Sequence, residues 1–196
     1  MSEPTLNDRF HLIGIGGAGM SVVAELLRSR GAIVEGSDRE DSAVLEHLRA
    51  VGVRVYVGHD ASHVDPTAVV VVSTAIRESN PELAIARERG QRVIHRSQAL
   101  ALAASGMRFV GVAGAHGKTS TSGMLAIALA ACGLDPSVAV GGVLPQLGTG
   151  AHLGAGDVFV AEADESDGSF LNYTPAIEIV TNVEPDHLDR YHSREE

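Results

Sequence analysis

Short apolar segments that alternate with amphipathic helical segments are the feature that most constrains the fold of this chain. Residues 68–72 read Ala-Val-Val-Val-Val, and such a continuous apolar run favours a strand in a parallel sheet that is covered on both faces. The alternation therefore predicts a doubly wound α/β architecture. The expected strands lie at 10–15, 32–35, 53–57, 69–73, 92–94, 109–113, 137–140, 158–161 and 177–181, and the expected helices include 20–29, 42–51, 81–89 and 118–132.

The composition is that of an ordinary globular protein, with 44% hydrophobic and 20% charged residues. A formal net charge of −10 argues against nucleic acid or an anionic membrane as a partner. The single cysteine, Cys132, cannot form an internal disulfide. The N-terminus is polar and no apolar run approaches the roughly 20 residues of a membrane helix. We therefore expect a cytoplasmic protein.

A small-residue stretch at 104–107 predicts a domain boundary. It divides the chain into a first α/β domain at 1–105 and a second domain at 106–196, each of an ordinary size. The second domain ends just after a segment rich in acidic residues and histidine, with no closing strand or helix in the sequence. We expect the chain to be the front part of a longer enzyme.

Residues 114–119, Gly-Ala-His-Gly-Lys-Thr, lie between an expected strand and an expected helix; we call them the phosphate loop. Glycines allow backbone N–H groups to approach phosphate oxygens, and a helix N-terminus adds partial positive charge. Lys118 would place a cation at the β- and γ-phosphates, and Thr119 would offer a hydroxyl to Mg²⁺. The strict eight-residue P-loop pattern fails, because Val112 stands where its first glycine belongs. A plain strand-to-helix turn is the alternative, and it leaves Lys118 and Thr119 unexplained.

Residues 14–19, here called the glycine loop, fit the pattern G-x-G-x-x-G between an expected strand and an expected helix. Asp38 follows Gly19 by 19 residues, at the end of the next expected strand, where an acidic residue can reach a ribose hydroxyl. The pattern indicates NAD, FAD or another pyrophosphate ligand. A glycine turn that serves only helix–strand packing is the alternative, and Asp38 is equally suited to a helix cap or a turn.

Acidic side chains follow two further strands. Glu162, Asp164, Glu165 and Asp167 come directly after 158–161, at the end of a strand where open α/β sheets bind ligands. Such crowding of like charges is costly unless a cation neutralises it, and hard carboxylate oxygens favour Mg²⁺. His187 follows the strand at 177–181 among three acids and is a candidate for a metal or phosphate role. A solvated acidic loop and an ordinary surface histidine are the alternatives.

Taken together, these segments resemble the Mur ligase family, the ATP-dependent amide-forming enzymes of peptidoglycan precursor synthesis. The resemblance is carried by residues 13–21, 114–119, 162–167 and 182–189 and covers essentially the whole chain. It implies a Rossmann-like UDP-binding domain followed by the first part of a P-loop-type ATPase domain, with the C-terminal domain absent and the fragment inactive by itself. Ala115 and Ser120 stand where the family commonly has Thr; Ala115 keeps its backbone N–H, so we expect a quantitative effect only.

The resemblance also implies a reaction and roles for residues. ATP would phosphorylate the lactyl carboxylate of UDP-N-acetylmuramate, and the amine of L-alanine would attack the acyl phosphate. Lys118 would stabilise the transferring phosphoryl group, while Mg²⁺ would be held by Thr119, by Glu162 (with Glu165 as its rival) and by His187. The implied ATP-phosphate residues are Gly114, Ala115, His116, Gly117, Lys118, Thr119 and Ser120. The implied UDP-sugar residues are Gly16, Gly17, Ala18, Gly19, Ser37 and Asp38.

Three other functions stay open from the sequence. A murein tripeptide ligase of cell-wall recycling would share most of these motifs. A NAD(P)- or FAD-dependent oxidoreductase would use the glycine loop but would leave Lys118 and His187 without a role. A UDP-sugar-binding protein without catalysis would bind ligand and not turn it over.

Overall fold

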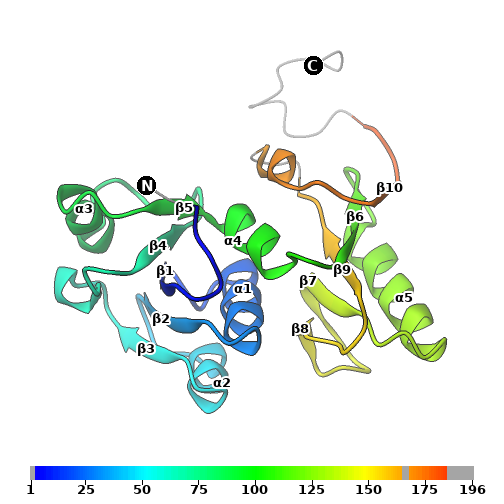
Figure 1. Cartoon of the computed structure of the whole chain (residues 1–196), viewed down its shortest axis with the longest axis horizontal. Helices are drawn as coiled ribbons and strands as arrows, with labels where there is room; N and C mark the ends of the chain where they lie inside the picture. The colour runs from blue at the N-terminus through cyan, green and yellow to red at the C-terminus, as the bar shows by residue number, and fades with distance from the viewer. Residues whose placement is uncertain (1–2, 165–167, 185–196) are drawn as a thin grey trace. The chain divides into compact units, whose positions relative to one another are not determined.

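The computed structural model describes residues 3–164 and 168–184, and the chain divides into two units, Met1–Ala103 and Ala104–Glu196. Each unit is built around its own five-stranded sheet (Figure 1). The expected α/β fold is confirmed. The two units are described separately below.

The first unit is a fully parallel sheet in the order β3-β2-β1-β4-β5. Its strands are β1 (Arg9–Ile13), β2 (Ile33–Asp38), β3 (Arg54–Val57), β4 (Val69–Val72) and β5 (Val93–His95). Its helices are α1 (Ala18–Ser29), α2 (Ala43–Ala50), α3 (Pro81–Glu88), α4 (Arg96–Ala103) and the 3₁₀ turn η1 (Ala61–His63). The central strand β1 is buried from Phe10 to Ile13, as expected for a strand that is covered on both faces.

Helix boundaries in this unit follow from local capping. The Ser42 hydroxyl accepts the Leu45 N–H at 3.3 Å and begins α2. The Asn80 side chain accepts the Glu82 N–H at 2.9 Å, and Pro81 occupies the first turn of α3, where its missing N–H costs nothing. The cap at Asn80 defines the first turn of α3 and thereby the point at which the Glu82 side chain enters the interior of the unit.

The second unit has the strand order β10-β6-β9-β7-β8. Its elements are β6 (Arg108–Ala113), α5 (Lys118–Ala131), β7 (Ser137–Leu144), β8 (Thr149–His152), β9 (Val158–Glu162), the 3₁₀ turn η2 (Ser169–Asn172) and β10 (Ile177–Val180). Neighbouring strands are parallel except β8, which pairs antiparallel with β7 in a hairpin that the sequence did not predict. Helix α5 packs on β6, β7 and β9 (Figure 1).

The topology places both loops at the carboxyl ends of inner parallel strands, where ligands are expected. The glycine loop follows the central strand β1, which lies between β2 and β4, and the phosphate loop follows β6, which lies between β9 and β10. In open parallel sheets, ligands bind at the carboxyl ends of strands, where the strand order reverses. No helix among the described residues is long and apolar enough to cross a membrane.

Gly36 offers a test of the close packing beside β1. A Cβ at this position would press on the Leu12 carbonyl oxygen and would lie 2.8 Å from Ile15 Cδ1. We expect Gly36→Ala to lower the free energy of unfolding by about 1–3 kcal/mol, measured by urea titration, because overpacking moves the backbone. Gly111→Ala in β6 is the matched control: its Cβ would make only ordinary contacts at 3.5 Å. Equal destabilisation by both substitutions would contradict this account.

Candidate functional site

The phosphate loop is shaped by two glycines with positive φ and by Lys118. Gly114 has a φ of +130° and Gly117, the residue before α5, has a φ of +85°, a region that side chains rarely adopt. The Lys118 ammonium folds back over the loop and donates to the Gly114 carbonyl oxygen at 2.7 Å. Lys118 is also the only lysine in the sequence. The loop thus holds a flexible cation beside the N-terminus of a 14-residue helix.

Residues that follow β10 hold the phosphate loop from the neighbouring strand. The Asn182 side chain accepts the His116 N–H at 3.2 Å and donates to the His116 carbonyl at 2.9 Å. The Thr181 hydroxyl contacts the same carbonyl at 2.6 Å and the Ala113 carbonyl at 3.1 Å. A Cβ at Gly114 would collide with this hydroxyl. The loop conformation is therefore set by its own glycines and by Thr181 and Asn182 together.

Glu162 lies at the end of β9, directly beside β6, with Val112 as its register partner. Its carboxylate accepts the Gly141 N–H at 3.1 Å, and a Cβ at the next residue, Gly142, would lie 3.2 Å from Thr119 Cγ2. Two glycines in β7 thus allow Glu162 and Thr119 to approach the same stretch of backbone. Carboxylate and hydroxyl oxygens are the hard ligands that Mg²⁺ prefers.

The predicted metal ligands lie only partly within the structure. His187 and Glu165, the rival of Glu162, fall outside the described residues. Among residues 3–164 and 168–184, no three side chains of the types His, Cys, Asp and Glu gather closely enough to hold a metal by themselves. Of the predicted ligands, Glu162 and Thr119 lie within the described residues, and their binding of a metal stays a prediction.

The glycine loop is held by the end of β2. The Ser37 carbonyl oxygen accepts the N–H groups of Gly14 and Ile15 at 2.8 and 2.9 Å. The Asp38 carboxylate accepts the Gly16 N–H at 2.8 Å, and the Gly17 N–H donates to the Gly14 carbonyl at 3.1 Å. Of the four glycine-loop residues that the resemblance implies for the UDP-sugar, Gly16 and Gly17 therefore have amides that are bonded within the protein.

The other two amides, of Ala18 and Gly19, belong to the first turn of α1, where N–H groups have no partner within the helix. Gly19 packs directly under the guanidinium of Arg96, the first residue of α4; a Cβ at Gly19 would collide with it. This contact brings a cation to the glycine loop. The two amides and Arg96 form an arrangement suited to an anionic group.

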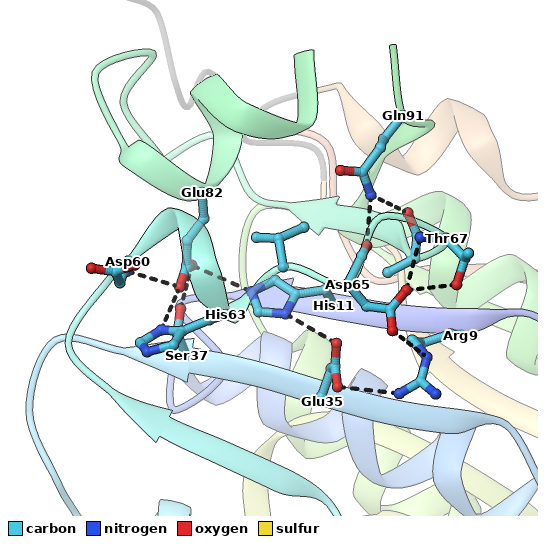
Figure 2. A network of polar contacts seen from close by, with 12 residues as sticks. Arg9, His11, Glu35, Ser37, Asp60, His63, Asp65, Thr67, Glu82 and Gln91 are labelled. Atoms are coloured by element: carbon cyan, nitrogen blue, oxygen red, sulfur yellow. Dashed lines mark hydrogen bonds and ion pairs between the residues drawn. The ribbon is translucent and has the colours of Figure 1, made fainter. Parts of the chain in front are cut away.

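Ser37, a predicted uridine contact, has no exposed surface. Its hydroxyl donates to the Glu82 carboxylate and contacts His59 Nδ1 at 2.8 Å, within the buried network that Figure 2 shows. Its observed role is to join β2 to α3. A contact between Ser37 and a ligand stays a prediction.

Four contributors were missed by the sequence reasoning. Thr181 and Asn182 lie in the segment that was considered because of His187. The amide side chain of Asn182, at the end of a strand, could itself have been recognised as a candidate for holding a loop. Arg96 follows directly after β5 and could have been read in the same way. Nothing local marks Glu82, which reaches Ser37 from 45 positions away.

Comparison with protein families gives two matches that together cover nearly the whole chain. The model described as the Mur ligase family catalytic domain matches residues 9–108. The model described as the Mur ligase middle domain matches residues 112–196. The break between the two matches lies just before the phosphate loop.

Curated relatives share more than half of their aligned residues with this chain. UDP-N-acetylmuramate–L-alanine ligase from Renibacterium salmoninarum is 57% identical over 192 residues, which are 97% of this chain and 41% of that protein. The enzyme of the same name from Kineococcus radiotolerans is 55% identical over 190 residues, covering 95% of this chain and 40% of that protein. The chain thus spans about two fifths of the length of these relatives.

Solved structures show the same fold. UDP-N-acetylmuramate–alanine ligase from Thermotoga maritima matches 94% of this chain and 43% of its own, with a TM-score of 0.83 at 32% identity. The UDP-N-acetylmuramate:L-alanyl-γ-D-glutamyl-meso-diaminopimelate ligase from Neisseria meningitides matches 93% of this chain and 63% of its own, with a TM-score of 0.85 at 32% identity.

Asn182 provides a direct test of how the phosphate loop is held. We expect Asn182→Ala to accelerate hydrogen exchange of the His116 amide by about tenfold, because that N–H loses its acceptor. The measurement is amide exchange followed by NMR. Val183→Ala is the control, because Val183 is exposed and next in sequence. Unchanged exchange in Asn182→Ala would show that the loop does not depend on this side chain.

Proposed function

Because the chain belongs to the Mur ligase family, we propose that it forms the substrate- and ATP-binding front part of a ligase that joins L-alanine to UDP-N-acetylmuramate. The observation that carries the proposal is 57% identity over 97% of the chain to a protein of that name. The conformation of the phosphate loop and the glycine loop supports it. The full reaction is proposed for the longer protein, of which this chain corresponds to about two fifths.

The chemistry assigned to the second unit is phosphoryl transfer. An oxygen of the lactyl carboxylate attacks the γ-phosphorus of ATP, the bond to the β-phosphate oxygen breaks, and ADP leaves. The amine of L-alanine then attacks the acyl carbon, loses a proton and displaces inorganic phosphate, which leaves an amide. Lys118 would neutralise charge on the transferring group, and the loop amides near α5 would orient it.

The side chains that we assign to Mg²⁺ have donor atoms of the kind that this ion prefers. The Glu162 carboxylate and the Thr119 hydroxyl lie at the ends of β9 and the phosphate loop, and both are hard oxygen donors. Bound there, Mg²⁺ would neutralise phosphate charge. His187 is proposed as a further ligand, as the family resemblance implies.

In the first unit we assign the pyrophosphate of the UDP-sugar to the start of α1. The Ala18 and Gly19 amides would donate to its oxygens, and the Arg96 guanidinium beside Gly19 would offset its charge. Gly16 and Gly17 would shape the loop, because their amides are bonded to Asp38 and to Gly14. Asp38 would thereby act on the loop in addition to any contact with the nucleoside.

Two alternatives from the sequence differ in their support. The murein tripeptide ligase is distinguished only by substrate, since the fold is similar to solved structures of both kinds; the identity to L-alanine ligases favours the main proposal. The oxidoreductase has no supporting observation beyond the glycine loop, which the family relationship already explains.

Ligand-induced stabilisation of this chain tests the assignment of the first unit. We expect UDP-N-acetylmuramate at about a hundred times its Kd to add roughly 2.7 kcal/mol and to raise the melting temperature by several degrees. NADH at the same concentration should leave it unchanged. The measurement is a thermal melt followed by circular dichroism. A shift with NADH alone would overturn the proposal in favour of an oxidoreductase.

The only lysine allows a selective test of the phosphate loop. We expect Mg²⁺-ATP to protect Lys118 from acetylation, read by peptide mass spectrometry, because the bound phosphates would cover its amine. UDP-N-acetylmuramate should give no protection. Lys118→Ala should weaken Mg²⁺-ATP binding at least about tenfold and change the Kd of the UDP-sugar less than about twofold. Loss of both affinities together would contradict separate binding sites.

A further inference from the structure

A row of alternating charges runs through the first unit from Arg9 to Glu82, and all its members except Arg9 are buried. Arg9 Nη1 lies 3.3 Å from Glu35 Oε2, and Glu35 Oε1 lies 3.7 Å from His11 Nδ1. The other ring nitrogen, His11 Nε2, lies 3.4 Å from Glu82 Oε2. His11 and Glu82 have no exposed surface, and Glu35 is 2% exposed. Figure 2 shows His11 between the two carboxylates, with Arg9 at the outer end of the row.

The surroundings of His11 favour its charged form. Each ring nitrogen faces a carboxylate, and neither has a hydrogen-bond partner within the described part of the chain. A neutral imidazole would turn a lone pair toward one of the two acids, whereas an imidazolium presents an N–H to each. With His11 charged, the row of Arg9, Glu35, His11 and Glu82 carries equal numbers of positive and negative charges.

The directions of the pKa shifts agree with this geometry. Burial by itself lowers the pKa of His11, but the contacts with Glu35 and Glu82 outweigh burial and raise it above 6.5. Burial by itself raises the pKa of Glu82, but the ion-pair contact with His11 and the hydrogen bond from Ser37 outweigh it and lower the pKa below 4.5. Each group therefore favours the charged form of the other.

Glu82 gathers donors from several segments. Besides His11, its carboxylate accepts the Ser37 hydroxyl and the Asp60 N–H at 3.3 Å, and it lies 3.2 Å from His63 Nδ1 and 3.4 Å from His59 Nδ1. The single hydroxyl proton of Ser37 points to Glu82, so His59 must donate to the Ser37 oxygen. One buried carboxylate thus connects β1, β2 and the segment around η1 to α3.

This connection ends at the glycine loop. Ser37, which Glu82 holds by its side chain, uses its carbonyl oxygen to accept the N–H groups of Gly14 and Ile15. The next residue, Asp38, accepts the Gly16 N–H. A shift of Ser37 would therefore move three amides of the loop that precedes α1.

We propose that His11 and Glu82 are positioning residues for the UDP-sugar: the buried His11 imidazolium holds the Glu82 carboxylate, which fixes Ser37 and Asp38 and, through them, the glycine loop. The proposal rests on the function proposed for the first unit. Neither side chain touches the ligand. The geometry assigns to this pair a pH-dependent effect on ligand affinity.

Several titratable or charged groups face this pair from the elements packed around it. Glu35 and Arg9 border His11, Tyr56 lies 6.5 Å from it between ring centroids, and Asp65 pairs with Arg9 at 3.5 Å. His59, His63 and Asp60 border Glu82. Tyr56 also stacks on His63, with ring centroids 4.3 Å apart. Because several ionisable groups surround the pair, the charge of His11 must be read from the NMR signal of its own ring.

The pH dependence follows from the two directions. Because folding raises the pKa of His11, its stabilisation is complete below pH 6.5 and is lost as pH rises through the folded-state pKa. Because folding lowers the pKa of Glu82, its stabilisation is complete above pH 4.5 and is lost as pH falls through the folded-state pKa. Both contributions are complete between pH 4.5 and 6.5.

The first experiment is an NMR titration of the imidazole nitrogens in the unmodified chain, with His11→Gln to assign the signal. We expect His11 to titrate above pH 6.5 and to be mainly charged at that pH. A titration midpoint of His11 at or below pH 6.5 would overturn the proposal, whatever the ligand.

The second experiment measures the Kd of UDP-N-acetylmuramate by calorimetry at pH 6.5 and pH 9. Glu82→Gln and His11→Gln should each weaken binding about tenfold at pH 6.5, and the difference in Kd from the unmodified chain should become smaller as pH rises through the folded-state pKa of His11. Glu78→Gln is the matched control, because Glu78 is exposed near the same helix and pairs only with Arg87 in the described structure. It should change the Kd less than about twofold.

The outcomes distinguish a failure of the proposed function from a failure of the positioning role. If the unmodified chain does not bind the UDP-sugar, the proposed function fails. If the unmodified chain binds and Glu82→Gln and His11→Gln bind as tightly as it does, the positioning role is wrong. Should Glu82→Gln not fold, Ser37→Ala removes the contact from the other side and should weaken binding about fivefold. Normal affinity in folded Ser37→Ala would likewise overturn the proposal.

Discussion

The carboxyl ends of neighbouring parallel strands fix the two loops on which the proposed chemistry depends. In the first unit, Asp38 at the end of β2 accepts the Gly16 N–H at 2.8 Å. In the second unit, Asn182 after β10 accepts the His116 N–H at 3.2 Å. In each case the strand next to the one that the loop follows supplies the side chain, because neighbouring parallel strands end on the same side of the sheet. A loop held in this way needs little ordering when a ligand binds, and that lowers the cost of binding.

This arrangement also explains the polar groups inside the first unit. A parallel strand that is covered on both faces is expected to be apolar, and Phe10, Leu12 and Ile13 fit that rule with no exposed surface. His11 lies among them and is equally buried. Its two carboxylate neighbours come from β2 and α3, so the charged groups join the central strand to α3 and to β2, which ends beside the glycine loop.

The sequence predicted those features that local pattern determines. Apolar runs located nine of the strands, and glycine spacing located both loops, because turns with positive φ require glycine at positions such as Gly114 and Gly117. Strand β8 was missed, since its four residues, Thr-Gly-Ala-His, form no apolar run. The partners of the loops could not be predicted either. Asn182 reaches His116 across 66 positions, and that proximity arises from the order β10-β6-β9, which no local pattern encodes.

The energetics of buried ion pairs indicate why the row through His11 serves geometry rather than stability. Replacing a buried ion pair by apolar side chains of similar size is often neutral or stabilising, whereas removing one partner is strongly destabilising. An apolar residue in place of Glu82 could fill the same space, but it could not accept the Ser37 hydroxyl and the Asp60 N–H. Both donors would then be left without their acceptor at the end of β2 and in the segment before η1. The charge on His11 thus stabilises the buried Glu82 carboxylate, which holds Ser37 beside the glycine loop. Desolvation of these charges costs free energy, and the result is a defined position for Ser37 and Asp38.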